Sequence, residues 1–347
     1  HAYVGGILAQ KYYGKSSYNL FVNQIVSHHT GLHDSDEIKE IINQEIPSEV
    51  NIYHTKEKLN RPEFNIQAND FHHLARMLFS CLVDADFLDT EAFMVRESYT
   101  LRQNKDALND LLPLLENKLK ELKAKADSSE INIIRNQIQQ QCLKMADTPT
   151  GFYSLTVPTG GGKTLSSLVW AIKHALKNGQ KRVIIAIPYT SIIVQTASVL
   201  RSIFGEENVL EHHSCVDPEQ IKDEKLKEKM KLATENWDYP IIVTTNVQLF
   251  VSMFSNKPSA CRKLHNIVNS VIILDEVQTL PTDYLQPIVD SLKTYNKLFN
   301  VSFLFTTASQ PVLSGFIEGC NPKAAFNGID HITEIIPDDF NLHDKLR

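Results

Sequence analysis

A glycine-rich segment constrains this chain more than any other feature: Val157-Pro158-Thr159-Gly160-Gly161-Gly162-Lys163-Thr164. An apolar run, Phe152 to Val157, precedes it, and a run with helical spacing, Leu165 to Leu176, follows it. A strand, a glycine-rich loop and a helix in this order are typical of a phosphate-binding loop. Val157 stands where the usual pattern has its first glycine.

The residue types in this segment fit a nucleotide triphosphate. The three glycines allow backbone N–H groups to turn toward phosphate oxygens, and the start of the helix adds its positive dipole end. Lys163 is expected to contact the β- and γ-phosphates, and the Thr164 hydroxyl is expected to hold Mg²⁺. We therefore predict ATP and Mg²⁺ as cofactors, bound by Gly160, Gly161, Gly162, Lys163 and Thr164.

A second motif consists of an apolar run that ends in two acids, Ser270-Val271-Ile272-Ile273-Leu274-Asp275-Glu276-Val277-Gln278. A buried parallel strand brings its last residues to the carboxyl edge of the sheet, beside the phosphate loop. Asp275 is expected to hold Mg²⁺, directly or through water, and Glu276 to orient and deprotonate the attacking water. Alone, this motif would fit a strand that ends in a solvated acidic turn. Together with the glycine-rich loop it predicts ATP hydrolysis.

The part of the chain from about residue 136 to 347 alternates apolar runs with helical ones. Such alternation predicts a parallel sheet covered on both faces, here a RecA-like lobe. Further strands are expected at Arg182–Ile187, Pro240–Thr245, Val271–Leu274 and Val301–Phe305.

Residues 1–100 show helical spacing of apolar residues, for example at Leu74, Met77, Leu78 and Cys81, and predict an all-α bundle. Residues 101–135 carry leucines at helical spacing followed by mixed charges, and we expect a solvated amphipathic linker helix there. The predicted fold class is an all-α domain followed by an α/β lobe.

Four residues of the first region combine into a candidate metal site: His1, the pair His28-His29, and Asp86. Imidazoles and a carboxylate inside a helical bundle suit Mn, Fe, Co, Ni or Zn better than Ca. Two such metals would activate a water and hold both oxygens of a phosphodiester during its cleavage. A pair of solvated or structurally bonded histidines is the alternative interpretation.

Composition limits the partners and the compartment. The net charge of −6 provides no general attraction for nucleic acid, so any contact must come from a local groove. Five cysteines without a CxxC pattern predict a reduced, cytoplasmic protein rather than a disulfide or zinc-ribbon scaffold. No apolar run approaches the roughly 18 residues of a membrane span, so no membrane partner is expected.

Two segments of the first region resemble a known family. Leu82-Val83-Asp84-Ala85-Asp86-Phe87-Leu88-Asp89-Thr90-Glu91 and His28-His29-Thr30-Gly31-Leu32-His33-Asp34 are similar to the HD-type nuclease domain of the type I CRISPR-associated helicase–nuclease. The resemblance implies that His28 and His29 are metal ligands, that Asp86 completes the site, and that His1 matches the histidine before the pair. It also implies that a further histidine and a His-Asp doublet precede residue 1. The implied metal is Mn²⁺, Co²⁺, Ni²⁺ or Fe²⁺.

Segments of the second region resemble superfamily 2 helicases. Thr307-Ala308-Ser309 is similar to the motif that couples ATP hydrolysis to strand movement. Pro188-Tyr189-Thr190-Ser191-Ile192-Ile193 and Thr244-Thr245-Asn246-Val247-Gln248 are similar to DNA-contacting segments, which implies that Thr190, Ser191, Thr244 and Thr245 contact single-stranded DNA. Arg135 and Gln137 are expected to recognise adenine, as in related helicases.

The resemblance is closest to the type I-C branch in two runs, Val157–Ser166 and Leu210–Ser214. It implies recruitment to an RNA-guided Cascade complex, 3′-to-5′ movement on the displaced strand and antiviral defence, with a viral inhibitor protein as a further candidate partner. It also implies a second RecA lobe beyond this sequence, so that this chain alone is expected to be poorly active. Two other hypotheses remain: an ordinary superfamily 2 helicase with a non-catalytic α-helical domain, and an inactive fragment that serves as a docking module.

A second arrangement of the metal site is also open. His33-Asp34 is itself a His-Asp doublet, and His54, His72-His73 and Asp86 follow it in a plausible order. This doublet lacks the apolar lead-in and the following Gly-Lys that usually mark the motif, so we rank this arrangement second.

Overall fold

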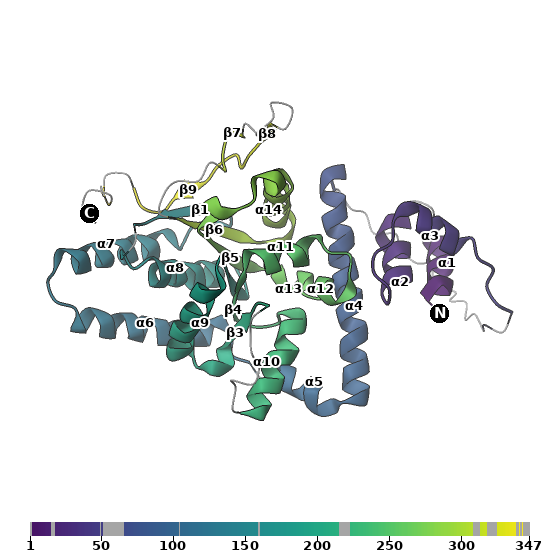
Figure 1. Cartoon of the computed structure of the whole chain (residues 1–347), viewed down its shortest axis with the longest axis horizontal. Coiled ribbons are helices and arrows are strands. Elements are labelled where there is room, and N and C mark those ends of the chain that lie inside the picture. The colour runs from purple at the N-terminus through teal and green to yellow at the C-terminus, as the bar shows by residue number, and fades with distance from the viewer. Residues whose placement is uncertain are drawn as a thin grey trace. The chain divides into compact units, whose positions relative to one another are not determined.

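The structure is a computed structural model that describes residues 2–14, 18–48, 50, 66–103, 105–158, 160–214, 223–307, 313–317, 325–337, 340 and 342. It divides into two compact units (Figure 1). The first comprises His1–Tyr99 and Val251–His265, and the second comprises Thr100–Phe250 and Asn266–Arg347.

Among the residues that the structure describes, the first unit contains helices and loops and no strand, as the apolar spacing predicts. A small apolar core joins its first three helices through Ala9, Val22, Val26, Ile38 and Ile42. Its elements are α1 (Ala2–Tyr13), a π-helical turn (Tyr18–Val22), α2 (Asn23–Ser27), α3 (Ser35–Ile42), a 3-10 turn (Ala68–Asp70), α4 (Phe71–Met94), the first half of α5 (Arg96–Gln103), the end of α11 (Asn246–Phe254), α12 (Pro258–Cys261) and the start of α13 (Leu264–Ile267).

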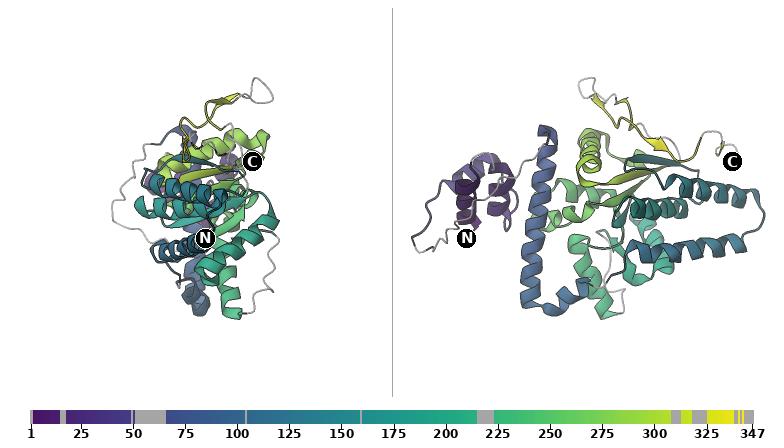
Figure 2. Two further views of the ribbon diagram at one scale, coloured as in Figure 1. Left: turned by 90° about the vertical axis from the view of Figure 1, so that its left-hand side faces the viewer. Right: turned by 180° about the vertical axis from the view of Figure 1, so that it is seen from behind.

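The second unit contains a parallel sheet with strand order β3-β4-β2-β5-β6-β1-β9. In both views of the ribbon, α7, α8 and α9 lie on one side of this sheet and α14 on the other (Figures 1 and 2). The strands are β1 (Phe152–Thr156), β2 (Arg182–Ile187), β3 (Val209–His212), β4 (Ile241–Thr245), β5 (Ser270–Asp275), β6 (Ser302–Thr307) and β9 (Thr333–Glu334), and β7 (Phe316–Ile317) pairs separately with β8 (Phe326–Asn327). The helices are α6 (Leu108–Lys125), α7 (Glu130–Met145), α8 (Lys163–Lys177), α9 (Thr190–Phe204), α10 (Glu224–Asn236) and α14 (Leu285–Phe299), with 3-10 turns at Glu206–Asn208, Val277–Thr279 and Thr282–Tyr284.

The predicted order of a helical region and a parallel-sheet lobe of the RecA type is confirmed. The expected strands β1, β2, β4, β5 and β6 all form, because each is an apolar run buried on both faces of the sheet. The short edge strands β3 and β9 were not predicted. Among the described residues, no helix combines the length and the apolar composition that crossing a membrane requires.

The expected linker is only partly solvated. In α6, the leucines Leu108, Leu111 and Leu115 are buried in the core of the second unit, against α8 and α9. The expectation of a solvated amphipathic helix is therefore wrong for this face of α6, whose apolar stripe packs on the RecA-like lobe. The mixed-charge residues that follow, around Lys123–Ser128, are exposed. The assignment of residues 101–135 as a linker remains a prediction.

A buried histidine joins α8 to the sheet. His174 Nδ1 donates to the carbonyl oxygen of Ala146 at 3.2 Å, and the Ser302 hydroxyl lies 2.9 Å from His174 Nε2. Burial lowers the pKa of His174 from 6.5 to about 4, and the hydrogen bond to Ala146 opposes that shift. The folded protein therefore keeps this imidazole neutral at pH values where the unfolded chain is protonated.

We predict a pH-dependent loss of stability from His174. Because the unfolded chain binds a proton below pH 6.5 and the folded chain binds it only near pH 4, stability falls through this window by about 1.4 kcal/mol per pH unit. In the His174→Gln variant the loss between pH 7 and pH 5 should be smaller by about 2 kcal/mol. Urea unfolding followed by tryptophan fluorescence measures it, because both tryptophans, Trp170 and Trp237, lie in the second unit. Equal losses in the two proteins would contradict the prediction.

Candidate functional site

The glycine-rich loop joins β1 to α8. At its start, the Val157 N–H donates to the carbonyl oxygen of Thr307 at 3.2 Å, and the Val157 side chain is buried in the core. This position extends the strand, so a glycine is not required there. Gly160 and Gly162 have φ values of +85° and +79°, in the left-handed region that favours glycine, and Gly162 caps α8. Thr159 lies outside the described residues.

The first residue of α8 forms the central ion pairs of this site. Lys163 Nζ lies 2.6 Å from Glu276 Oε1 and 3.1 Å from Asp275 Oδ1. All three side chains are largely buried, with exposed fractions of 19–25%. Glu276 has a φ of +47°, which is unfavourable for a residue with a Cβ and is typical of functional sites. The two motifs found in the sequence therefore meet at one point.

The electrostatics of this cluster fix the charge of its members. Burial works to lower the pKa of Lys163, but hydrogen bonds and charges from Glu276 and Asp275 outweigh it and raise the pKa above the ordinary value. Burial likewise works to raise the pKa of Glu276, but hydrogen bonds from Lys163 and Gln278 outweigh it and lower the pKa. Lys163 is therefore a cation and Glu276 a carboxylate at neutral pH.

A chain of hydrogen bonds extends from the acids to β6. The Thr306 hydroxyl donates to Asp275 Oδ1 at 2.5 Å, and Gln278 Nε2 donates to Glu276 Oε2 at 2.6 Å. The Thr307 hydroxyl in turn donates to Gln278 Oε1 at 2.8 Å. Thr307, the described member of the predicted coupling motif, thus connects to Glu276 through Gln278; Ala308 and Ser309 lie outside the described residues.

Sequence reasoning missed the roles of Thr306 and Gln278. The pairing of β5 with β6 places Thr306 opposite Asp275, which only the register of two parallel strands determines. A run of hydroxyl residues after an apolar strand was the one available signal for Thr306.

The two residues expected to recognise adenine lie apart. Arg135 Nε donates to the carbonyl oxygen of Gly160 at 2.9 Å, so its guanidinium supports the phosphate loop. Gln137 follows it by two positions, about 200° further around α7. It lines a cavity of about 570 Å³ with Lys144 and Phe340. The contact of Gln137 with adenine stays a prediction, as does that of Arg135.

The predicted DNA-contacting residues lie at the carboxyl ends of neighbouring strands β2 and β4. Ser191 is exposed, and Thr190 and Thr245 are partly exposed. Thr245 Oγ1 accepts the N–H of Gln248 at 2.9 Å and so caps α11. Thr244 differs, because its side chain is buried and its hydroxyl donates to the carbonyl oxygen of His212 at 2.7 Å. We therefore retain Thr190, Ser191 and Thr245 as candidate contacts and correct Thr244 to a supporting residue.

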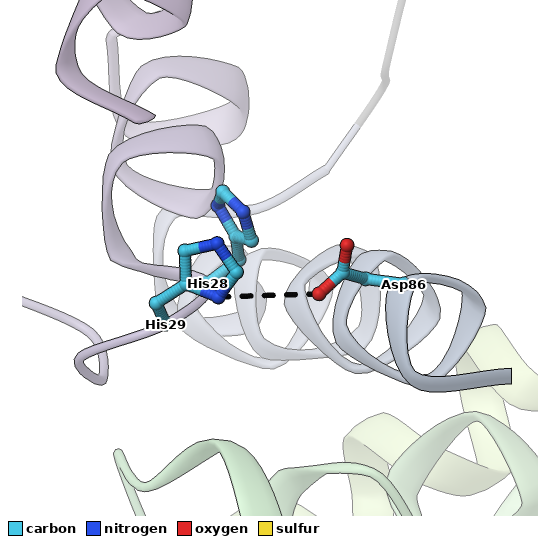
Figure 3. A group of neighbouring side chains, drawn as sticks. All are labelled: His28, His29 and Asp86. Atoms are coloured by element: carbon cyan, nitrogen blue, oxygen red, sulfur yellow. Dashed lines mark ion pairs between the residues drawn. The ribbon is translucent and has the colours of Figure 1, made fainter. Parts of the chain in front are cut away.

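The first unit contains a group of side chains that could share a metal ion. One ligand atom from each of His28, His29 and Asp86 lies within 4.8 Å of the others, and no further such group occurs among the described residues. His29 Nδ1 is 3.9 Å from Asp86 Oδ2, and the two imidazole rings lie 3.9 Å apart between centroids. Figure 3 shows the histidines at the end of α2 facing the Asp86 carboxylate on α4. His1 lies outside the described residues.

The orientation of His28 suits metal ligation. His28 Nδ1 donates to the carbonyl oxygen of Ile25 at 2.6 Å, which leaves Nε2 as the unprotonated nitrogen. Such a backbone hydrogen bond is the usual way in which proteins fix the tautomer of a metal-binding histidine. Two nitrogens and one carboxylate oxygen fit the mixed donor set of Mn²⁺, Fe²⁺, Co²⁺ or Ni²⁺.

The second arrangement of the metal site gains less support. Asp34 caps α3 by accepting the N–H groups of Asp36 and Glu37. His33 is bonded through one nitrogen to Glu37, at 3.1 Å, and through the other to Thr30, at 2.9 Å. Burial lowers the pKa of His73 to about 3, and its side chain packs inside the unit. His54 lies outside the described residues.

Sequence comparisons match this chain to a helicase family and to proteins named as CRISPR-associated nuclease/helicases. The sequence profile of DEAD/DEAH box helicases matches residues 136–314. The CRISPR-associated nuclease/helicase Cas3 of Haloferax volcanii is 28% identical over 193 residues, which cover 50% of this chain and 20% of that protein. The putative Cas3 of Methanocaldococcus jannaschii is 36% identical over 137 residues, covering 36% of this chain and 18% of that protein. The chain thus matches about a fifth of the length of these relatives.

The fold is shared with solved structures. T. fusca Cas3 crystallised with AMPPNP superposes with a TM-score of 0.53 at 15% identity, over 88% of this chain and 38% of that one. Another T. fusca Cas3 structure gives a TM-score of 0.55 at 13% identity, over 88% of this chain and 40% of that one. Because the helicase profile spans both nucleotide motifs and more than half of the chain, this protein belongs to the DEAD/DEAH box helicase family.

Proposed function

We propose that this chain is part of an ATP-driven single-stranded DNA translocase and metal-dependent DNA nuclease of type I CRISPR interference. The observation that supports the ATP-driven activity is the pair of ion pairs that Lys163 forms with Asp275 and Glu276. The second activity is supported by the cluster of His28, His29 and Asp86, together with relatives named as nuclease/helicases.

In the proposed ATPase site, each residue changes partner when nucleotide binds. Lys163 would leave the two acids and contact the β- and γ-phosphates, and Thr164 and Asp275 would hold Mg²⁺. Glu276, already ionised, then takes a proton from the attacking water. Gln278 and Thr307 connect Glu276 to β6, so a movement of Glu276 reaches the coupling motif.

The proposed DNA contacts are neutral. Ser191, Thr190 and Thr245 can donate hydroxyl hydrogen bonds to phosphate oxygens, and backbone N–H groups at the start of α9 can do the same. This mode of binding fits a protein whose net charge is −6. We infer a single strand along the carboxyl edge of the sheet, with recruitment by a Cascade complex as the source of target specificity.

In the proposed nuclease centre, His28 Nε2, a nitrogen of His29 and an oxygen of Asp86 are the ligands. A divalent metal bound there would supply a water of lowered pKa for phosphodiester cleavage. His28 is positioned by its bond to Ile25, and Asp86 is presented by the long helix α4.

A helicase with a non-catalytic N-terminal domain is the main rival. It predicts the same ATPase behaviour but no metal-dependent cleavage of DNA. A docking module without catalysis predicts neither activity in the full-length protein.

We predict that substitutions at Lys163 and Glu276 both lower ATP hydrolysis but differ in their effect on ATP binding. Lys163→Ala should lower both ATP binding and ATP hydrolysis, because the phosphates lose their cation, whereas Glu276→Gln should keep binding and lower kcat by about a hundredfold or more. Lys173→Ala serves as the matched control, since Lys173 lies on the same helix and pairs with Glu116. Nucleotide affinity and single-strand-stimulated phosphate release measure the two effects. An unchanged rate of ATP hydrolysis in Glu276→Gln would show that Glu276 is not the base that deprotonates the attacking water.

We predict that DNA cleavage depends on Asp86 and not on Lys163. In the full-length protein with Mn²⁺, Co²⁺ or Ni²⁺, Asp86→Ala should abolish cutting of single-stranded DNA and leave the ATPase active. Lys163→Ala should still cut single strands without ATP. Asp89→Ala, an exposed acid on the same helix, is the matched control. Normal cleavage of single-stranded DNA by Asp86→Ala would contradict this metal site. If neither the wild type nor any variant cleaves DNA, the helicase with a non-catalytic N-terminal domain is favoured.

A further inference from the structure

A segment of the helicase sequence is built into the first unit. Val251–His265 lies in the chain between β4, which ends at Thr245, and β5, which carries Asp275. Its residues nevertheless belong to the compact unit that contains His28, His29 and Asp86. We call Val251–His265 the bracket segment.

One part of the bracket segment holds the loop that follows the histidine pair. The Leu32 N–H donates to the carbonyl oxygen of Asn256 at 2.9 Å, and Asn256 Nδ2 donates back to the Leu32 carbonyl oxygen at 3.4 Å. Gly31 has a φ of +113°, and a Cβ at this position would lie 3.0 Å from the Asn256 carbonyl oxygen. The loop therefore approaches the bracket segment as closely as only glycine permits.

Another part of the bracket segment holds the helix that carries Asp86. Arg262 Nε donates to Asp84 Oδ1 at 2.9 Å, and both side chains are at most 6% exposed. The Arg262 guanidinium also lies over the ring of Phe87, 4.4 Å from its centroid. Arg262 thus contacts residues on either side of Asp86 in the sequence of α4.

A second attachment lies one turn earlier on α4. The His265 N–H donates to Ser80 Oγ at 3.1 Å, and His265 Nδ1 lies 2.9 Å from the same oxygen. His265 Nε2 lies 3.3 Å from Asp84 Oδ2. Together with Arg262 these contacts fix both the rotation and the axial position of α4.

We propose that the bracket segment positions both halves of the metal centre, with Arg262 as the positioning residue for Asp86 and Asn256 as the support of the histidine loop. This inference rests on the proposed metal function of His28, His29 and Asp86. Arg262 touches no ligand atom and acts through Asp84 and Phe87. The geometry of the metal centre then depends on a segment whose two ends continue into the strands that carry Thr245 and Asp275.

The pattern of contacts favours positioning over simple stabilisation. A buried ion pair often contributes little net stability, because desolvation of both charges offsets their attraction. Its main effect is to define one arrangement of the elements that it joins. Here those elements are the bracket segment and the turn of α4 that presents Asp86.

The test is a titration of the full-length protein, stripped of metal, with Co²⁺ alone. Arg262→Gln should weaken Co²⁺ binding about tenfold or more and change the visible absorption of the bound ion, as loss of a residue that orients a ligand does. Arg262→Lys should restore part of the affinity. Arg102→Gln is the matched control, because Arg102 is similarly buried and pairs with Glu235 in the second unit. It should stay within about twofold of the wild type.

The outcomes separate the inference from the proposed function. If the wild type binds no Co²⁺, or if Asp86→Ala binds it equally well, the proposed metal function fails and the inference fails with it. If the wild type binds Co²⁺ and Arg262→Gln matches Arg102→Gln, only the inference is overturned. If Arg262→Gln does not fold, Ser80→Ala decides, since it removes only the hydroxyl that bonds His265. Weaker Co²⁺ binding by Ser80→Ala than by Arg102→Gln supports the positioning role of the bracket segment. Equal Co²⁺ binding by the two variants overturns it.

Discussion

The parallel register of β1, β5 and β6 is the constraint on which the nucleotide site depends. Thr156 of β1 lies opposite Thr307 of β6, and Asp275 of β5 lies opposite Thr306. Because all three strands end at the same edge, the glycine-rich loop, the paired acids and Thr307 meet there. The ion pairs of Lys163 with the two acids are a consequence of this register, as is the hydrogen bond from the Thr306 hydroxyl to Asp275.

The charge balance at this edge suits the proposed nucleotide site. Lys163 neutralises part of the charge of two acids that would otherwise repel each other at short range. In the proposed function the phosphates would take Lys163 from the two acids, and Mg²⁺ held by Asp275 would replace its positive charge there. The strained backbone of Glu276 is compatible with this exchange, because it directs the carboxylate into the site and not along the strand.

The sequence predicted those parts of the structure that depend on local pattern. The central strands, the loop and the paired acids are recognisable because buried parallel strands are continuous apolar runs and because phosphate loops require particular residue types. The short strands β3 and β9, the burial of Leu108 and Leu111 in α6, and the position of Gln137 depend on tertiary packing, which the sequence pattern does not determine. The burial of Thr244 also depends on tertiary packing, because its hydroxyl donates to His212 in β3, a strand that the sequence pattern did not predict.

The bracket segment shows most clearly what local pattern cannot supply. Arg262 stands in a polar stretch between two predicted strands, and Asp84 stands inside an amphipathic helix, so neither residue indicates the other. A helix of the length of α4 can rotate or slide on an apolar surface at small cost, because hydrophobic contacts are not directional. A buried charge that must face one partner removes that freedom, since any rotation leaves the charge unpaired. The arrangement of Asp84 and Arg262 therefore explains why Asp86 faces the histidine pair, a specificity that apolar packing of α4 alone would not provide.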